Sequence, residues 1–437
     1  MILGIRAETK YPSEKRVAVI PEHVNKLVKQ GFKVLVQSSN KRIFTDEEYE
    51  KAGAKIVNSL EQADIIIGIK EIPEEEIYAD KVYLFFSHTI KGQKHNIPML
   101  KQLIKQRATL IDYEKIVDDF GKRLIFFGNY AGNAGLVDTL WMVGKRLVYK
   151  GIANPFDKLK RAFEYSNLDN IIASMSEIGF DILKNGLPES LIPFIIGITG
   201  YGNVSKGVQE ILHFLPVKEI LPEDLKRFSD IPPSPHHIYK VVFKEKDMVK
   251  RRDGGKFDLN DYYLHPENYE SIFYQYLPYL NVLIHASYWD QKYPRVVEEK
   301  YIIDNWGKPD FRLLGIGDIS CDINGGVEIT KTSTEVENPV LIYNPATRDY
   351  IIDLYSEGLP VLAVDILPTE LPMDASTYFS SILLPYIEAL LKANWKKNFN
   401  KLEIPLPLKR GTILYKGKFT PDYEYMKQFI NNNQKKQ

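Results

Sequence analysis

The sequence of 437 residues has little of three features that mark particular protein classes: cysteine, net charge and long hydrophobic runs. Its one cysteine, Cys321, excludes an intramolecular disulfide and is typical of a reducing compartment. The 57 basic and 57 acidic residues balance, which argues against an extended nucleic-acid-binding surface. No apolar run approaches the ~18 residues of a membrane-spanning helix, and the N-terminus lacks the apolar core of a signal peptide. We therefore expect a cytoplasmic protein without nucleic-acid or membrane partners.

Hydrophobic residues make up 44% and charged residues 26% of the chain, as in ordinary globular proteins. The length exceeds that of one typical hydrophobic core, so we expect two domains. Short apolar runs alternate with amphipathic segments, which predicts an α/β protein with two Rossmann-like domains, parallel sheets and an interdomain cleft. Residues 1–135, completed by 366–437, are assigned to an N-terminal substrate and catalytic domain. Residues 136–365 are assigned to a dinucleotide-binding domain, with an insertion of loops and short helices at 223–278.

Three short apolar runs of the first domain read as buried strands: residues 65–69, 82–86 and 108–111. Lys70 follows the first run directly, and His88 and Glu114 follow the other two closely. The carboxyl ends of parallel strands meet at one edge of a sheet, so the three side chains are expected to face one crevice. A lysine whose pKa is lowered by burial, beside a histidine, makes a proton-transfer pair. A further strand is expected at 121–128, and a helix at 376–391 is expected to pack back onto this domain.

Other charged residues near the same strand ends are candidate substrate ligands. Three are cations suited to carboxylates: Arg16, Lys91 and Arg123. Glu71 and Glu114 could form ion pairs with Lys70. For each residue alone, a polar group at a surface loop is the competing explanation. Together they favour a substrate rich in carboxylates.

A glycine-rich loop opens the second domain. Gly200 and Gly202 directly follow an apolar strand and precede a helix, as in dinucleotide-binding folds. The first glycine permits the tight turn and the second allows the backbone to approach a pyrophosphate, with Asn203 and Val204 in the first helical turn. Ser205 stands where the motif has glycine or alanine, which weakens the match. The strand–turn–helix context still favours dinucleotide binding.

The choice between NAD and NADP is left open by the residues. A second strand is expected at 217–221. Glu223 and Asp224 follow it and could bind a ribose hydroxyl, whereas Lys226 and Arg227 could bind a 2′-phosphate. A solvated charged turn explains all four residues equally well.

Two further features of the second domain bear on cofactor and metal binding. Asp318 ends a predicted buried strand and is expected to face the nicotinamide end of the site, with a capping role as the alternative. His236 and His237 lie side by side, but no cysteine or acidic cluster accompanies them. We therefore expect no metal site.

Several long motifs resemble one family. They are RAETK, EKRVAVIPEHV, GIKEIP, FFSHTIKGQ, LIDYEKIVDDFGKRLIFFGNYAGNAG, TGYGNVSKG and GDISCDINGGVE. Together they resemble lysine–ketoglutarate reductases, which are saccharopine dehydrogenases of the lysine-forming kind and relatives of alanine dehydrogenase. The segment at 223–278 and the motif ASYWDQKYPR resemble the reductase half of the bifunctional aminoadipic semialdehyde synthases. The resemblance spans nearly the whole chain.

The resemblance implies a role for each matching residue. Lys70 and His88 match the acid–base pair of the family, and Glu71 and Glu114 match the carboxylates that tune the lysine. Arg16, Lys91 and Arg123 match substrate-binding cations. The loop Gly200–Ser205 matches the cofactor-binding turn, and Asp318 and Asp365 match positions beside the nicotinamide. The implied cofactor is NADP(H), with NAD left open by the residues themselves.

The implied reaction joins the ε-amine of L-lysine to the keto carbon of 2-oxoglutarate and reduces the imine to saccharopine. Two alternatives stay open. An amino-acid dehydrogenase of the alanine type would use ammonia and a short keto acid, and a dinucleotide-binding sensor would lack catalysis. The sequence leaves the direction of the reaction and the formation of a homo-oligomer undetermined.

Overall fold

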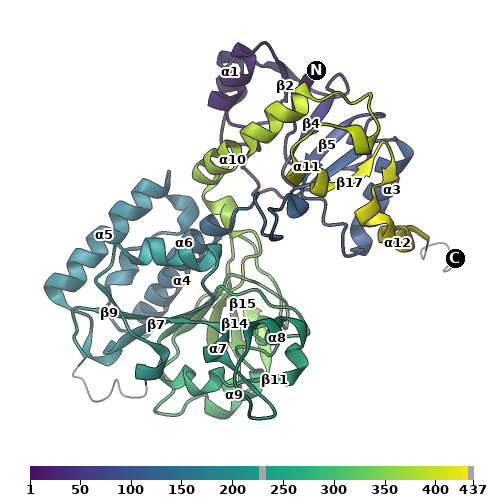
Figure 1. Ribbon diagram of the computed structural model, residues 1–437. Coiled ribbons are helices and arrows are strands. Elements are labelled where there is room, and N and C mark those ends of the chain that lie inside the picture. The colour runs from purple at the N-terminus through teal and green to yellow at the C-terminus, as the bar shows by residue number, and fades with distance from the viewer. Residues whose placement is uncertain (226–232, 432–437) are drawn as a thin grey trace. The chain divides into compact units, whose positions relative to one another are not determined.

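The computed structural model describes residues 1–225 and 233–431. The chain forms two compact units, each built around an eight-stranded sheet (Figure 1). The first unit comprises Met1–Phe127 and Pro372–Gln437, and the second comprises Gly128–Leu371. The chain leaves and re-enters the first unit at the starts of two long helices, α4 (Gly128–Tyr149) and α10 (Pro372–Lys392). The sequence analysis placed the boundaries after residues 135 and 365, whereas the units divide after residues 127 and 371.

The first sheet has the strand order β18-β17-β6-β5-β4-β1-β2-β3. Its parallel strands are β1 (Ile2–Ile5), β2 (Lys33–Gln37), β3 (Lys55–Val57), β4 (Ile65–Ile67), β5 (Val82–Phe85) and β6 (Thr109–Asp112). At one edge β17 (Thr412–Tyr415) and β18 (Lys418–Phe419) run antiparallel. Strands β4 and β5 are buried at every residue because their isoleucine, valine, leucine and aromatic side chains meet apolar neighbours on both faces. The three predicted strands are therefore parallel neighbours, as expected.

The helices of the first unit begin and end where sequence signals favour it. They are α1 (Pro21–Lys29), α2 (Asp46–Lys51), α3 (Ile97–Lys105), α10, α11 (Leu406–Gly411) and α12 (Lys427–Asn431). Proline occupies the start of α1, and a capping box on Thr45 begins α2. Helix α10 packs back onto the N-terminal segment, as predicted. The hydroxyls of Ser376 and Ser380 accept hydrogen bonds from the backbone of Val17 and Ile20 at 2.9 and 3.0 Å.

The prediction of a strand at 121–128 is wrong. Only an isolated bridge between Val117 and Arg123 forms there, and α4 begins at Gly128. The sheet position beside β6 is occupied by β17, which comes from the C-terminal end of the chain. Ile125 and Phe127 are buried as core residues without joining the sheet. An apolar run shows that a segment is buried, but not whether a partner strand has room for it.

The second sheet has the order β15-β14-β16-β13-β12-β7-β9-β8. Its strands are β7 (Phe194–Thr199), β8 (Val217–Glu219), β9 (Ile238–Phe243), β12 (Val282–His285), β13 (Gly315–Asp318), β14 (Val340–Asn344), β15 (Asp349–Ile352) and β16 (Leu359–Leu362). All pairs are parallel except those of β14, which runs antiparallel to β15 and β16. The helices are α4, α5 (Leu168–Asn185), α6 (Asn203–Leu212), α7 (Glu245–Met248), α8 (Leu259–Leu264) and α9 (Glu299–Asn305), and β10 (Val249–Arg251) pairs with β11 (Tyr269–Ser271).

The strand order corrects the interpretation of residues 217–278. The sequence analysis took residues 217–221 as the second strand of the fold. The position beside β7 is instead filled by β9, from the segment expected to hold only loops and short helices. Strand β8 lies outside β9, at the sheet edge. The apolar strand β9 takes the position with two covered faces, whereas Lys218 and Glu219 of β8 are exposed. The prediction of two Rossmann-like α/β domains is confirmed, with antiparallel strands added at one edge of each sheet.

Candidate functional site

The carboxyl edge of the first sheet places the predicted acid–base residues on neighbouring strands. Lys70 lies three residues beyond the end of β4 and His88 three beyond β5, and these strands pair in parallel with Ile67 opposite Leu84. Both side chains are half-buried. The Lys70 ammonium lies 5.6 Å from the centre of the Tyr11 ring, a cation–π contact. The two titratable groups thus follow adjacent strands at one edge.

Glu71 gathers polar groups around one carboxylate oxygen. Its Oε1 accepts from Lys10 Nζ at 2.6 Å and from Asn96 Nδ2 at 3.3 Å, and it lies 2.8 Å from His88 Nδ1. Burial raises the pKa of the Glu71 carboxyl, but hydrogen bonds from His88 and Lys10 outweigh burial and hold the pKa well below its usual value. Glu71 is therefore ionised at neutral pH and acts as a fixed negative charge.

The Glu71 carboxylate determines which ring nitrogen of His88 carries the hydrogen. Since an ionised carboxylate only accepts hydrogen bonds, Nδ1 of His88 carries the hydrogen in this contact and Nε2 is the basic atom of the neutral ring. The His88 backbone has a φ of 47°, and its carbonyl accepts from Asn96 Nδ2 at 3.1 Å. The ring stacks on Phe86 at a centroid distance of 6.2 Å. Glu71 and Phe86 thus orient the imidazole, and Asn96 holds the backbone of His88.

Glu8 was missed by the sequence analysis, although it lies in the motif RAETK. Its buried carboxylate accepts from the backbone N–H groups of Ile69 and Lys70 at 2.6 and 3.0 Å. Burial raises the pKa of Glu8, against the opposing charge of Arg6. Glu8 follows β1, the strand beside β4, so its side chain reaches the end of that neighbour. It fixes the backbone from which Lys70 projects.

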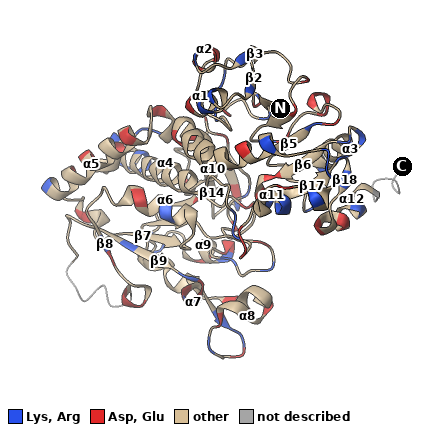
Figure 2. Ribbon diagram, turned by 45° about the horizontal axis from the view of Figure 1, so that its top comes forward, with Lys and Arg blue, Asp and Glu red and all other residues tan. Residues whose placement is uncertain are grey.

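The predicted substrate cations lie in different environments. Arg16 is buried and donates to both oxygens of Glu14 through Nε and Nη2, with its guanidinium 4.3 Å from the Phe127 ring centre. Arg123 is exposed and donates to Glu114 at 2.8 Å. Lys91 is exposed. Figure 2 shows basic and acidic residues interspersed in both units.

The glycine loop of the second unit has the geometry expected of a cofactor turn. Gly200 has a φ of +80°, which disfavours other residues, and its N–H donates to the carbonyl of Phe243 at 2.9 Å. A Cβ at Gly202 would meet no atom within 4 Å, so the backbone here is open to a bound group. Asn203 and Val204 form the half-buried first turn of α6. The N-terminus of α6 therefore fits a phosphate group.

Ser205 serves packing. Its side chain is buried, and its hydroxyl accepts from Gln209 Nε2 at 3.1 Å. Close packing in this motif is supplied by Gly207, where a Cβ would lie 2.0 Å from the carbonyl oxygen of Asn129 in α4. The departure from the glycine fingerprint at Ser205 thus leaves the loop itself intact.

The carboxyl edge of the second sheet holds a buried polar row. Asp318 accepts from Thr330 Oγ1 at 2.6 Å and from the N–H of Cys321 at 3.1 Å, and burial raises its pKa to about 7. His285, which sequence reasoning missed, lies opposite Asp318 in the sheet and 2.9 Å from Thr199 Oγ1 through Nδ1. Burial lowers the pKa of His285 to about 4. Asp365, beyond β16, is exposed.

The remaining predictions concern the charged residues at 223–227 and a metal site. Glu223 and Asp224 are exposed beyond β8, which is not the strand beside β7, and Lys226 and Arg227 lie outside the described residues. Within residues 1–225 and 233–431, no group of three or more histidine, cysteine, aspartate or glutamate side chains is arranged to hold a metal ion. In the same ranges no helix combines the length and apolar character needed to cross a membrane.

Comparison with known proteins places the chain in a family. Residues 4–134 match the family described as alanine dehydrogenase/PNT, N-terminal domain. A saccharopine dehydrogenase [NAD(+), L-lysine-forming] from Candida glabrata is 30% identical over 401 residues, which cover 89% of this chain and 91% of that protein. The chain belongs to the lysine-forming saccharopine dehydrogenase family. The resemblance drawn from the motifs is confirmed.

Other related proteins are more than twice as long as this chain. An alpha-aminoadipic semialdehyde synthase from Arabidopsis thaliana is 37% identical over 450 residues, covering 99% of this chain and 42% of that protein. The mitochondrial enzyme of the same name from Rattus norvegicus is 32% identical, covering 99% of this chain and 48% of that protein. The chain thus spans less than half the length of these two relatives.

Solved structures share the fold. An L-alanine dehydrogenase superposes with a TM-score of 0.64 at 17% identity, covering 99% of both chains. The transhydrogenase from Sinorhizobium meliloti gives a TM-score of 0.58 at 14% identity, covering 96% of this chain and all of that one. At these identities the likeness shows the two-domain fold of this saccharopine dehydrogenase family member.

Proposed function

We propose that the chain catalyses the NADP(H)-dependent reductive condensation of L-lysine with 2-oxoglutarate to saccharopine, and the reverse reaction. It is then an oxidoreductase acting on a CH–NH group. The observation that carries the proposal is the His88–Glu71 pair beside Lys70 at one sheet edge, in a chain of the lysine-forming saccharopine dehydrogenase family. The names of the related enzymes indicate the substrate class. The cofactor class is supported by the open turn at Gly202.

The proton transfers are assigned to the two residues that follow β4 and β5. Lys70, as the neutral amine, takes the proton from the attacking ε-amine of the substrate. The hydrogen bond from its backbone N–H to Glu8 fixes its position beyond β4. His88 serves as acid and base at Nε2 while the carbinolamine loses water, with Glu71 stabilising the imidazolium. A bound nicotinamide cofactor would supply the hydride that reduces the imine.

The cations are proposed to bind the three carboxylates of saccharopine. Glu14 takes the Nε and Nη2 edge of Arg16, so contact with substrate would use Nη1. The Arg123–Glu114 pair is exposed and therefore easily exchanged for a substrate carboxylate. Lys91 adds an exposed point charge.

The loop Gly200–Ser205 is proposed to bind the dinucleotide, the backbone at Gly202 and the first turn of α6 receiving the pyrophosphate. Asp318 and Asp365 are proposed to lie at the nicotinamide end. Since Asp318 is buried and hydrogen-bonded to Thr330 and Cys321, its part is to shape the wall there. A cytoplasmic location is likewise proposed, on the single cysteine.

One assay separates the candidate functions. We would measure oxidation of NADPH and NADH by the purified chain with lysine plus 2-oxoglutarate and with pyruvate plus ammonia. The proposal predicts turnover with the first pair and with NADPH preferred. Turnover only with pyruvate and ammonia would establish the alanine-type alternative, and dinucleotide binding without turnover of any pair would establish a sensor.

A further inference from the structure

Strand order identifies the part of the chain that meets the adenosine end of a dinucleotide. In doubly wound folds, the residue beyond the strand next to the glycine-loop strand approaches the adenosine ribose. Here that strand is β9, which pairs with β7 along its full length from Ile238 opposite Phe194 to Phe243 opposite Thr199. The Gly200 N–H donates to the Phe243 carbonyl at 2.9 Å, so the glycine turn and the end of β9 are directly joined. Strand β8 lies one position further out.

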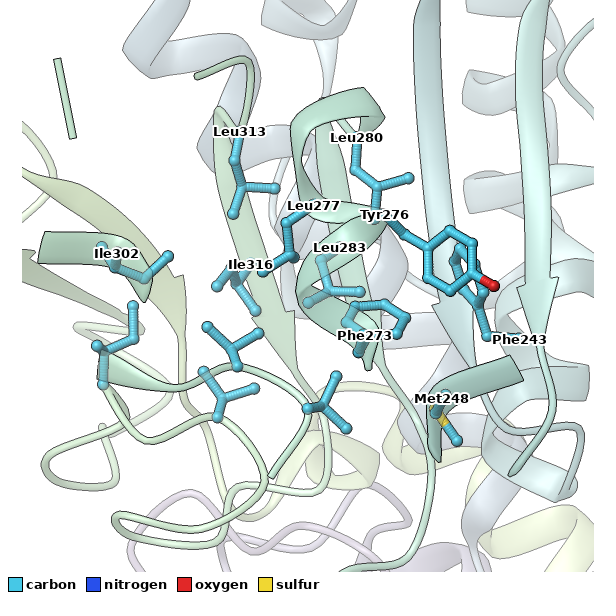
Figure 3. Packing of buried hydrophobic residues seen from close by; sticks show 14 of the residues in the cluster. Phe243, Met248, Phe273, Tyr276, Leu277, Leu280, Leu283, Ile302, Leu313 and Ile316 are labelled. Atoms are coloured by element: carbon cyan, nitrogen blue, oxygen red, sulfur yellow. The ribbon is translucent and has the colours of Figure 1, made fainter. Parts of the chain in front are cut away.

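The end of β9 is fixed by a buried aromatic cluster. Phe243 is fully buried and contacts the rings of Phe273 and Tyr276 at centroid distances of 4.9 and 4.8 Å (Figure 3). Met248, at the end of α7, lies in the same cluster. Successive side chains of a strand point to opposite faces. Because the Phe243 side chain is buried in the core, the side chain of the next residue points away from this cluster. Met248, Phe273 and Tyr276, from the segment expected to be an insertion, thus support the strand that lies beside the glycine loop.

That next residue is Lys244. Its side chain is exposed, and its ammonium lies 5.8 Å from the centre of the Tyr201 ring. Tyr201 is the residue between Gly200 and Gly202 of the loop. The Lys244 N–H donates to Asp247 Oδ2 at 2.9 Å, which fixes its backbone at the start of α7. A cation therefore stands beside the glycine loop, where an NAD-binding fold places an acid.

The neighbouring acid, Glu245, already interacts with two tyrosines. It accepts a hydrogen bond from the hydroxyl of Tyr263 in α8 at 2.7 Å, and its carboxylate also acts on the hydroxyl of Tyr201, raising the pKa of that group after burial. A ribose 2′-hydroxyl would have to compete with Tyr263 for this carboxylate. A 2′-phosphate needs only the ammonium of Lys244, since lysine binds phosphate as a point charge.

We infer that Lys244, held against Tyr201 at the end of β9, recognises the 2′-phosphate of NADP(H) and determines the preference for it over NAD(H). The inference rests on the proposed function, because it requires that the glycine loop bind a dinucleotide. It moves the specificity determinant from residues 223–227, where the linear sequence places it, to the end of β9.

Equilibrium binding of NADP⁺, NAD⁺ and the fragment 2′,5′-ADP, measured by titration calorimetry, tests the inference without turnover. Lys244→Ala should weaken NADP⁺ and 2′,5′-ADP by roughly ten- to hundredfold, the loss of one hydrogen bond to a charged group. NAD⁺ affinity should change by less than about twofold. Lys244→Arg should retain most of the preference. The matched control is Lys218→Ala, an exposed lysine on the outer strand β8, which should leave all three affinities unchanged.

The outcomes separate this inference from the proposed function. If the unaltered chain binds neither dinucleotide, the proposed function fails. If it binds NADP⁺ and Lys244→Ala binds it equally well, or if Lys226→Ala with Arg227→Ala removes the preference instead, only the inference is overturned. Tighter binding of NAD⁺ than NADP⁺ by the unaltered chain would also overturn it.

Discussion

The carboxyl edges of the two sheets use the same residue types in opposite states. In the first unit His88 meets an ionised Glu71, and the imidazole is about one-third exposed. In the second unit His285 and Asp318 are buried, and burial moves the pKa of His285 down to about 4 and that of Asp318 up to about 7. A histidine and an acid at strand ends are therefore not by themselves a proton-transfer site. Exposure of the histidine and additional donors to the acid make the difference.

The largest effect is expected from removing the proposed base. Lys70→Met should lower the rate of lysine-dependent NADPH oxidation by roughly 10²–10⁴-fold, the usual contribution of a positioned acid or base. Lys101→Met, an exposed lysine on α3, is the matched control and should retain full activity. A Lys70→Met chain that turned over at the unaltered rate would remove the mechanism.

Glu71→Gln should have a smaller effect than the loss of Lys70. The amide keeps the shape of the side chain but removes the negative charge that orients His88 and stabilises its charged form. We expect a loss of roughly 10–100-fold in kcat with little change in dinucleotide affinity. Glu114→Gln changes an acid that follows β6, two strands away from β4, and should cost less. Equal losses for the two variants would show that Glu71 has no special part.

The buried acid should appear in stability. The folded chain holds a proton on Asp318 up to about pH 7, whereas the unfolded chain releases it near pH 4. Stability should therefore fall as pH rises through this window, by about 1 kcal/mol for each pH unit. Asp318→Asn, which mimics the protonated acid, should lose less over the same range. Denaturant unfolding from pH 5 to pH 8 measures this, and parallel curves for both chains would contradict it.

The smallest effect on stability is expected at Arg123. Its ion pair with Glu114 is exposed, so Arg123→Ala should change the free energy of unfolding by less than about 1 kcal/mol. The KM for 2-oxoglutarate or saccharopine should rise while kcat changes little. An unchanged KM would remove Arg123 from the substrate site.

Local sequence signals predicted the elements that depend on local chemistry. The strands before Lys70 and His88 are short, β-branched or aromatic runs, and α1, α2 and α3 have proline or capping signals at their starts. The glycine turn was predicted because a positive φ at Gly200 and an open backbone at Gly202 leave a visible pattern.

Long-range pairing was not predictable in the same way. Glu8 reaches Lys70 only because β1 lies beside β4, and β17 reaches β6 from the far end of the chain. Strand β9 was missed because prolines, tyrosines and charges surround it, and its position beside β7 is decided by burial on two faces rather than by chain order. His285 and His88 both lie at or just beyond the end of a strand, and the sequence does not show that only His285 is fully buried.

The most direct measurement compares the two histidines in one assay. Lysine-dependent NADPH oxidation would be measured for His88→Asn and His285→Asn at a temperature where circular dichroism shows both to be folded. The account predicts a loss of roughly 10²-fold or more for His88→Asn and a change of less than about fivefold for His285→Asn. Near-full activity of His88→Asn, or a larger loss for His285→Asn, would contradict it.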